Sequence, residues 1–167
     1  ENEKLESSNN ETDYSQLSTK YPSTINMYAS SLTPSKQKIH FITYGNNQYS
    51  KVKDLLAKQA QETKWFDSVV AFNENMLTNE FKTKFANILN QPRGGGYWIW
   101  KYDIIMQTLN KINDGDIIVY VDGGSYLNLN GKKRFLEYID MLNNDEKQFG
   151  LISFNNGCCE EKYTTRQ

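Results

Sequence analysis

Cysteine, histidine and proline are scarce in this sequence, with two, one and three copies among 167 residues. The two cysteines, Cys158 and Cys159, are adjacent, and neighbours in sequence rarely reach the geometry of a disulfide with each other. A disulfide-stapled secreted framework is therefore not expected, and a reducing compartment fits best. The single histidine, His40, lies in a predicted strand and excludes a metal site built from several histidines.

Long apolar runs and an excess of charge of either sign are also missing. No stretch of about 18 apolar residues occurs, which excludes a membrane span within the sequence given. The 19 Lys and Arg residues nearly balance the 20 Asp and Glu residues, so no long-range field favours nucleic acid or an anionic membrane. We therefore expect a soluble, cytoplasmic protein that does not bind nucleic acid.

Residues 1–36 differ in composition from the rest of the chain. They are rich in Ser, Thr, Asn, Glu and Lys and have no sustained apolar period, which predicts a polar linker or surface arm that is partly disordered. Docking of the second half of this arm on the domain stays open as an alternative. The pattern changes at Lys38, and residues 37–167 are predicted to form one domain.

Short apolar runs alternate with amphipathic stretches throughout this domain. Strands are predicted at 39–44, 66–72, 117–121 and 149–154, and helices at 49–63, 81–89, 99–112 and 135–142. This order predicts an α/β fold with a mostly parallel, doubly wound, Rossmann-like sheet and helices on both faces. Such folds bind ligands beyond the carboxyl ends of their strands, so polar residues that follow strands are the candidates for a site.

The segment RGGGYWIWK, residues 93–101, has the most unusual composition in the chain. Its three glycines free the backbone to bend closely around a ligand just before a helix, where amide groups can face a phosphate. Arg93 and Lys101 add positive charge that suits a diphosphate. Tyr97, Trp98 and Trp100 offer flat surfaces for a sugar or a base. The alternative for any one of these residues is a flexible loop with core tryptophans.

Asp122 follows the apolar run 117–121 and is itself followed by two glycines. Its carboxylate would project into the crevice, where it could hold a hard divalent cation that neutralises a leaving diphosphate. The alternative is an aspartate that caps a turn, and a second carboxylate is missing nearby in sequence. Asp114 and Asp116 precede the same run, at its opposite end, and are assigned to a structural turn.

Four blocks of the sequence read KIHFITYG, RGGGYWIWK, NDGDIIVYVDGG and NGKKRFLEYIDML. They resemble successive blocks of a glycosyltransferase family with a GT-A-like fold, whose pattern is approximately R-G-x-G-Y-W-x-W-K-P, then D-G-D, then Y-x-D-A-G. Members of this family occur in polysaccharide gene clusters and in large DNA viruses. The resemblance covers roughly residues 38–166, and for a viral member the cytoplasm would be that of the host.

The resemblance implies transfer of a sugar, such as a hexose, from a nucleotide diphosphate, commonly UDP, to a glycan, protein or other hydroxyl acceptor. It also implies a divalent cation, Mn or Mg, at Asp122, with Thr43 and Tyr44 near the base and Lys101 near the diphosphate or sugar. Asp122 and Lys101 are the expected catalytic residues. The expected nucleotide-sugar-binding residues are Thr43, Tyr44, Arg93, Tyr97, Trp98, Lys101, Tyr120, Val121 and Asp122.

Three positions depart from the family pattern. Tyr102 replaces a proline, Gly124 replaces the second carboxylate of a D-x-D site, and a later aspartate falls on Gln167. The second change leaves Asp122 a weak cation ligand without donor phosphates, and the third predicts a domain that is incomplete at its carboxyl end. The alternative function is a noncatalytic nucleotide- or glycan-binding module of a larger glycosylation assembly. A nucleotide-binding oxidoreductase or phosphotransfer domain is a weaker alternative, since neither phosphate-loop signature occurs.

Overall fold

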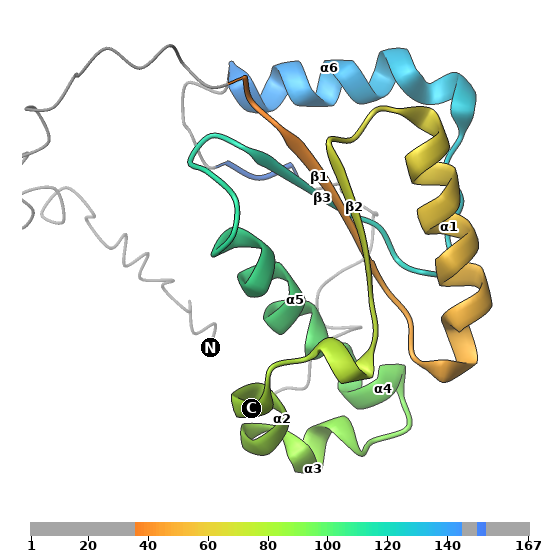
Figure 1. Cartoon of the computed structure of the whole chain (residues 1–167), viewed down its shortest axis with the longest axis vertical. Coiled ribbons are helices and arrows are strands. Elements are labelled where there is room, and N and C mark those ends of the chain that lie inside the picture. The colour runs from red at the N-terminus through yellow and green to blue at the C-terminus, as the bar shows by residue number, and fades with distance from the viewer. Residues whose placement is uncertain (1–35, 145–149, 153–167) are drawn as a thin grey trace, which may run out of the picture. The chain divides into compact units, whose positions relative to one another are not determined.

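The computed structural model describes residues 36–144 and 150–152, and every helix and strand named below lies in the unit that begins at Gln37. The described residues form a sheet of three parallel strands, β1 (Ile39–Tyr44), β2 (Ser68–Phe72) and β3 (Ile117–Tyr120), in the order β2-β1-β3. Figure 1 shows these strands at the centre, with helices around them. The arm predicted at 1–36 stays a prediction, because residues 1–35 lie outside the described part of the chain.

Helices cover both faces of the sheet. Successive residues of a strand point to opposite faces, so neighbouring apolar residues of β1 enter different clusters. On one face Phe41 packs with Leu56 and Ala60 of α1 (Ser50–Thr63). On the other face Ile42 packs with Trp100 and Ile104 of α5 (Trp100–Leu109) and with the neighbouring α2 (Asn79–Lys84). The predicted α/β fold with a parallel sheet is confirmed, and the three-stranded sheet is compatible with a Rossmann-like layout.

Several predicted boundaries differ from those of the structure. The apolar stripe 81–89 is divided into α2 and α3 (Ala86–Leu89), because Phe85 between them has a non-helical backbone. The helix predicted at 135–142 is α6 (Lys132–Asn143), and Figure 1 shows it at the end of the sheet opposite α2, α3 and α4 (Gly94–Tyr97). None of the helices in the described residues is long and apolar enough to cross a membrane.

The fourth strand predicted at 149–154 is not formed by the residues that the structure describes there. Residues 150–152 have no strand conformation, and the others lie outside the described residues. Gly150 has a φ of 63°, which is in the left-handed region and incompatible with an extended strand.

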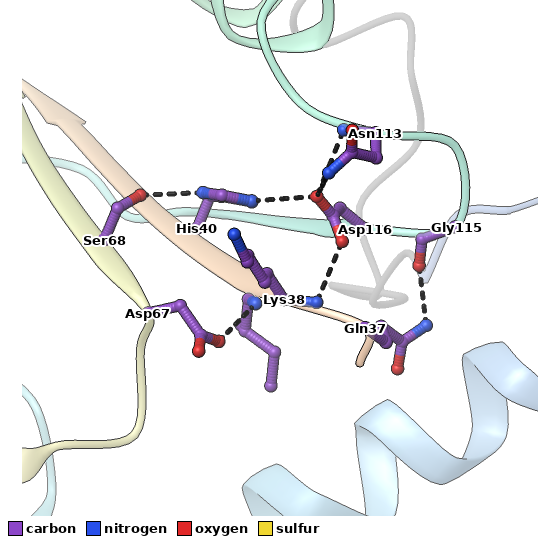
Figure 2. Close-up of polar contacts among 9 residues, drawn as sticks. Gln37, Lys38, His40, Asp67, Ser68, Asn113, Gly115 and Asp116 are labelled. Atoms are coloured by element: carbon purple, nitrogen blue, oxygen red, sulfur yellow. Dashed lines mark hydrogen bonds and ion pairs between the residues drawn. The ribbon is translucent and has the colours of Figure 1, made fainter. Parts of the chain in front are cut away.

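A polar cluster joins the amino ends of the three strands (Figure 2). Asp116, just before β3, accepts hydrogen bonds from the backbone N–H groups of Lys38 at 2.8 Å and Asn113 at 3.1 Å. Its carboxylate also lies 3.2 Å from Nε2 of His40 in β1, whose Nδ1 lies 2.7 Å from the Ser68 hydroxyl in β2. A neutral ring with its proton on Nε2 satisfies both contacts. The lone histidine therefore has a structural role, and Asp116 links β1 to β3.

Acid should weaken this cluster through Asp116. Its pKa is lowered from 3.8 to about 2, chiefly by the hydrogen bond from the Lys38 backbone, and burial opposes that shift. A carboxyl whose pKa is lower in the folded state stabilises the fold above its unfolded pKa and loses that contribution as the pH falls through its folded pKa. We expect the free energy of unfolding, measured in urea, to fall between pH 4 and pH 2, and to fall less steeply in Asp116→Asn. Asp114→Asn, in the same turn, is the control, and an unchanged slope in Asp116→Asn would contradict the assignment.

Candidate functional site

A cavity of about 330 Å³ lies at the carboxyl ends of β1 and β3. The chain passes from β1 through α1 to β2 on one side of β1, and then returns through α5 to β3 on the other side. The crevice between two strands that diverge in this way is where doubly wound sheets bind ligands. Residues of three segments supply the lining: 44–49 at the end of β1, part of 92–100 around the glycines, and 122–124 after β3. The volume is within the range of about 300–1,000 Å³ that small-molecule sites occupy.

The glycine segment forms a left-handed turn at one wall of this cavity. Five consecutive residues, from Gly94 to Trp98, have φ between 52° and 91°. Glycine adopts these angles readily, whereas a residue with a side chain loses about 1–2 kcal/mol in a left-handed helical conformation. Tyr97 and Trp98 therefore hold strained backbones. Strain of this kind is often concentrated at binding sites, which makes the turn a candidate for ligand contact.

Trp100 holds this turn against the sheet. Its side chain is only 5% exposed, and its ring stacks on that of Tyr44 with centroids 3.8 Å apart. Its indole N–H donates to the carbonyl oxygen of Gly94 at 2.9 Å. Burial, with a smaller contribution from Glu74, raises the pKa of Tyr44 to about 12, so Tyr44 is neutral at physiological pH. The end of β1 and the glycine turn are thus joined through one buried tryptophan.

Two exposed aromatic side chains line the cavity, one from each side. Trp98 is 45% exposed on the glycine turn, and Tyr49 is 50% exposed just before α1. The Arg93 guanidinium lies 5.8 Å from the centre of the Trp98 ring, at a distance that allows a cation–π contact. Tyr97 is 55% exposed and is not part of the lining. The flat surfaces that the cavity offers a ligand are therefore Trp98 and Tyr49.

Asp122 and Lys101 form an ion pair at the edge of the cavity. Lys101 Nζ, in the first turn of α5, lies 3.0 Å from Asp122 Oδ1, and the Tyr120 hydroxyl donates to the same oxygen at 2.5 Å. Burial alone would raise the pKa of Asp122, but the hydrogen bonds from Tyr120 and Lys101 and the charge of Lys101 hold it below its usual value. Burial and the bond to Asp122 raise the pKa of Tyr120. The carboxylate is therefore ionised and the phenol neutral at physiological pH.

The two glycines at the strand ends are packed against Lys53 of α1. A side chain on Gly45 would come 2.9 Å from Lys53 Cβ, and one on Gly123 would come 2.5 Å from the carbonyl oxygen of Tyr44. The Lys53 side chain is 7% exposed, and its ammonium pairs with Asp54 at 3.1 Å. Glycine at both positions lets α1 approach the cavity floor closely.

No protein-family model, curated protein or solved structure matches this chain. Proteins with a parallel α/β sheet have many unrelated functions, so a function for this chain must be argued from the side chains of the cavity. The lining combines exposed aromatic rings with Asp122, whose partner Lys101 lies at the cavity edge. This composition suits a ligand with a flat ring and a charged group.

Two of the residues predicted to bind a donor lie away from the cavity. Thr43 is fully buried in β1, and its hydroxyl has no hydrogen-bond partner among the described residues. Val121 packs with Phe41 and Leu56 on the face that α1 covers. Alternation along each strand directs Tyr44 and Asp122 to the cavity, and the residues just before them to the opposite face. Of the predicted residues, the lining contains Tyr44, Trp98 and Asp122, and Lys101 and Tyr120 join the site through their contacts with Asp122 Oδ1. Arg93 and Tyr97 lie outside the lining.

The metal predicted at Asp122 fits poorly with the side chains around it. The described residues contain no group of three or more His, Cys, Asp or Glu side chains arranged to hold a metal ion. The oxygen Oδ1 of Asp122 already accepts from an ammonium and a hydroxyl, and Gly124 has no side chain to add a second carboxylate. Mg²⁺ usually binds through one or two carboxylates together with substrate phosphates and water, and the one carboxylate in the described lining is already paired with Lys101. The metal stays a prediction from the sequence.

Proposed function

We propose that this chain is the donor-binding domain of a GT-A-like glycosyltransferase, which transfers a sugar, such as a hexose, from a nucleotide diphosphate to a hydroxyl of a glycan or protein. UDP is the nucleotide that we expect. One observation carries the proposal: the cavity at the divergence of β1 and β3 is lined by the strained, exposed Trp98 and by Asp122 with its Lys101 partner. The resemblance of the RGGGYWIWK and YVDGG blocks to a glycosyltransferase family supports it.

Each part of the donor has a chemical counterpart at this cavity. The rings of Trp98 and Tyr49 offer exposed faces on which a base or a sugar ring can stack. The Lys101 ammonium, at the cavity edge, is placed to bind a diphosphate oxygen. A fixed positive charge at that position would stabilise the negative charge that develops on the departing nucleoside diphosphate. Binding and leaving-group stabilisation are thus the roles that we assign to this domain.

Calorimetric titration with UDP-glucose, UDP and GDP-glucose tests the proposal. We expect one nucleotide class to bind, and Trp98→Ala to weaken it roughly five- to 150-fold, since stacking of a base on an aromatic ring contributes about 1–3 kcal/mol. Tyr97→Ala is a matched control, because Tyr97 has the same left-handed backbone and similar exposure but does not line the cavity. Failure of the folded chain to bind any of the three, or equal losses in both variants, would contradict the proposal.

A noncatalytic nucleotide- or glycan-binding module is the second candidate. Asp122 is the only acidic residue in the cavity lining that the structure describes, and its Oδ1 is occupied by Lys101 and Tyr120. The described lining therefore contains no second carboxylate that could act as a general base for an acceptor hydroxyl. Release of UDP from UDP-glucose in the presence of glycan acceptors separates the candidates. Turnover supports the transferase, and tight donor binding without turnover supports the module.

A further inference from the structure

The carboxylate of Asp122 at the cavity is already paired with a cationic side chain of the protein, that of Lys101. Lys101 Nζ lies 3.0 Å from Asp122 Oδ1, at the place where the sequence pattern predicts a divalent metal. We propose that Lys101 takes the place of that metal, so that the diphosphate of the donor binds to the Lys101 ammonium without a divalent cation. This inference rests on the proposed function, because it concerns how the same site binds the same donor.

The surroundings of Lys101 fix the position of its ammonium group. Nζ lies 4.9 Å from the centre of the Tyr120 ring and 5.8 Å from that of Trp100, within the range of cation–π attraction. The ammonium is therefore held by the side chains of Asp122, Tyr120 and Trp100. The lysine side chain is also 35% exposed, so it still reaches solvent. An ammonium has three N–H donors, and Asp122 does not use all of them. A phosphate oxygen can therefore bind to a group whose position is already ordered, which lowers the entropy lost on binding.

Asp122 acts as a positioning residue in this arrangement. Its Oδ1 accepts from both Lys101 and Tyr120, which sets the lysine at the cavity edge. A divalent cation on the same oxygen would lie close to the ammonium and be repelled by it, unless Lys101 moved away. Gly124, two residues after Asp122, has no side chain that could act as a second metal ligand. The site therefore has no further carboxylate there that would favour a metal ion as the partner of Asp122 in place of Lys101. The electrostatics of this site therefore favour Lys101 as the partner of the diphosphate.

The decisive experiment measures the metal dependence of binding to the wild-type chain. UDP and UDP-glucose are titrated calorimetrically in EDTA and, separately, in MnCl₂ and MgCl₂, and MnCl₂ is also titrated alone. We expect the same Kd in all three buffers and no saturable binding of Mn²⁺ alone. Binding that appears with MnCl₂ or MgCl₂ and disappears in EDTA would overturn the inference and leave the proposed function standing. Absence of nucleotide binding in every buffer would overturn the proposed function, and this inference with it.

Variants then identify the group that binds the diphosphate. Lys101→Met retains the length of the side chain and removes its charge, and we expect UDP to bind about tenfold more weakly or worse, the usual loss for a hydrogen bond to a charged group. Lys111→Met, just after the same helix, is the control and should bind as wild type does. Asp122→Asn retains an oxygen that can accept from the ammonium and removes the charge that positions it, so it should lose some affinity but less than Lys101→Met. A larger loss in Asp122→Asn, or none in Lys101→Met, would show that Lys101 is not the cation that binds the donor.

Discussion

Replacing Trp100 with alanine is expected to lower the free energy of unfolding by about 3–5 kcal/mol, the usual loss for a buried aromatic side chain. Trp100 is 5% exposed and lies in the apolar cluster between the sheet and α5, where it stacks on Tyr44. Its removal leaves a cavity next to β1 and deletes the hydrogen bond to the Gly94 carbonyl oxygen. Urea unfolding followed by circular dichroism at neutral pH measures the effect.

Two further variants separate the contributions of Trp100. Trp98→Ala is the matched control, since it is the same substitution two residues earlier at a side chain that is 45% exposed. We expect it to change the free energy of unfolding by about 1 kcal/mol or less. Trp100→Phe retains a ring against Tyr44 but no N–H for the Gly94 carbonyl oxygen, so it should retain most of the stability and loosen the turn. A loss in Trp100→Ala no larger than that in Trp98→Ala would refute the central position given to this residue.

The strands and long helices could be predicted because their apolar residues recur with the period of the element. Residues 117–121 are a continuous apolar run and 39–44 are mostly apolar, β-branched or aromatic, as a strand covered on both faces requires, and the structure forms β3 (Ile117–Tyr120) and β1 there. The division between α2 and α3 could not be predicted, since the apolar stripe through Phe81, Phe85 and Leu89 keeps helical spacing across the break. The sequence already contains a signal against the fourth strand at 149–154, because a glycine such as Gly150 inside a strand weakens that strand.

The site was predictable to the extent that it follows strand ends. Asp122 follows β3 and is predicted from that position, the glycine segment predicts Trp98, and the family resemblance predicts Tyr44. The resemblance also predicts Thr43 beside Tyr44, but adjacent residues of a strand face opposite sides of the sheet, and Thr43 is buried away from the cavity. Tyr49 is missed because the helical spacing predicts a helix that begins at residue 49, whereas the structure places Tyr49 just before α1, at the cavity.

Lys53 was also missed, although the sequence contains a signal for it. Its spacing of three, four and seven residues from Leu56, Ala57 and Ala60 places it on the buried stripe of α1. A lysine at a stripe position buries its aliphatic stem, which here packs against Gly45 under the cavity. The left-handed backbone of Tyr97 and Trp98 had no such signal, because sequence patterns do not predict positive φ for aromatic residues.

Gly96→Ala should destabilise the protein through both its backbone and its packing. Gly96 has a φ of 91°, where a side chain introduces about 1–3 kcal/mol of strain. The added Cβ would lie 2.7 Å from Cα of Leu89 and 2.9 Å from the carbonyl oxygen of Ile88. Both are backbone atoms that no rotamer change can move, so overpacking adds about 1–3 kcal/mol. We expect the free energy of unfolding in urea to fall by the sum of these contributions.

Gly115→Ala separates the two effects. Gly115 has nearly the same φ, 86°, but an added Cβ would meet no atom within 4 Å. It should therefore show the backbone strain alone, and the difference between the two variants measures the contact between the glycine turn and α3. Because the same turn holds Trp98 at the cavity, Gly96→Ala should also weaken UDP binding, whereas Gly115→Ala should not. Equal destabilisation by both substitutions would mean that the turn can move away from Leu89. The strained conformation of Trp98 would then depend instead on its contact with Arg93 and on the hydrogen bond from Trp100 to the Gly94 carbonyl oxygen.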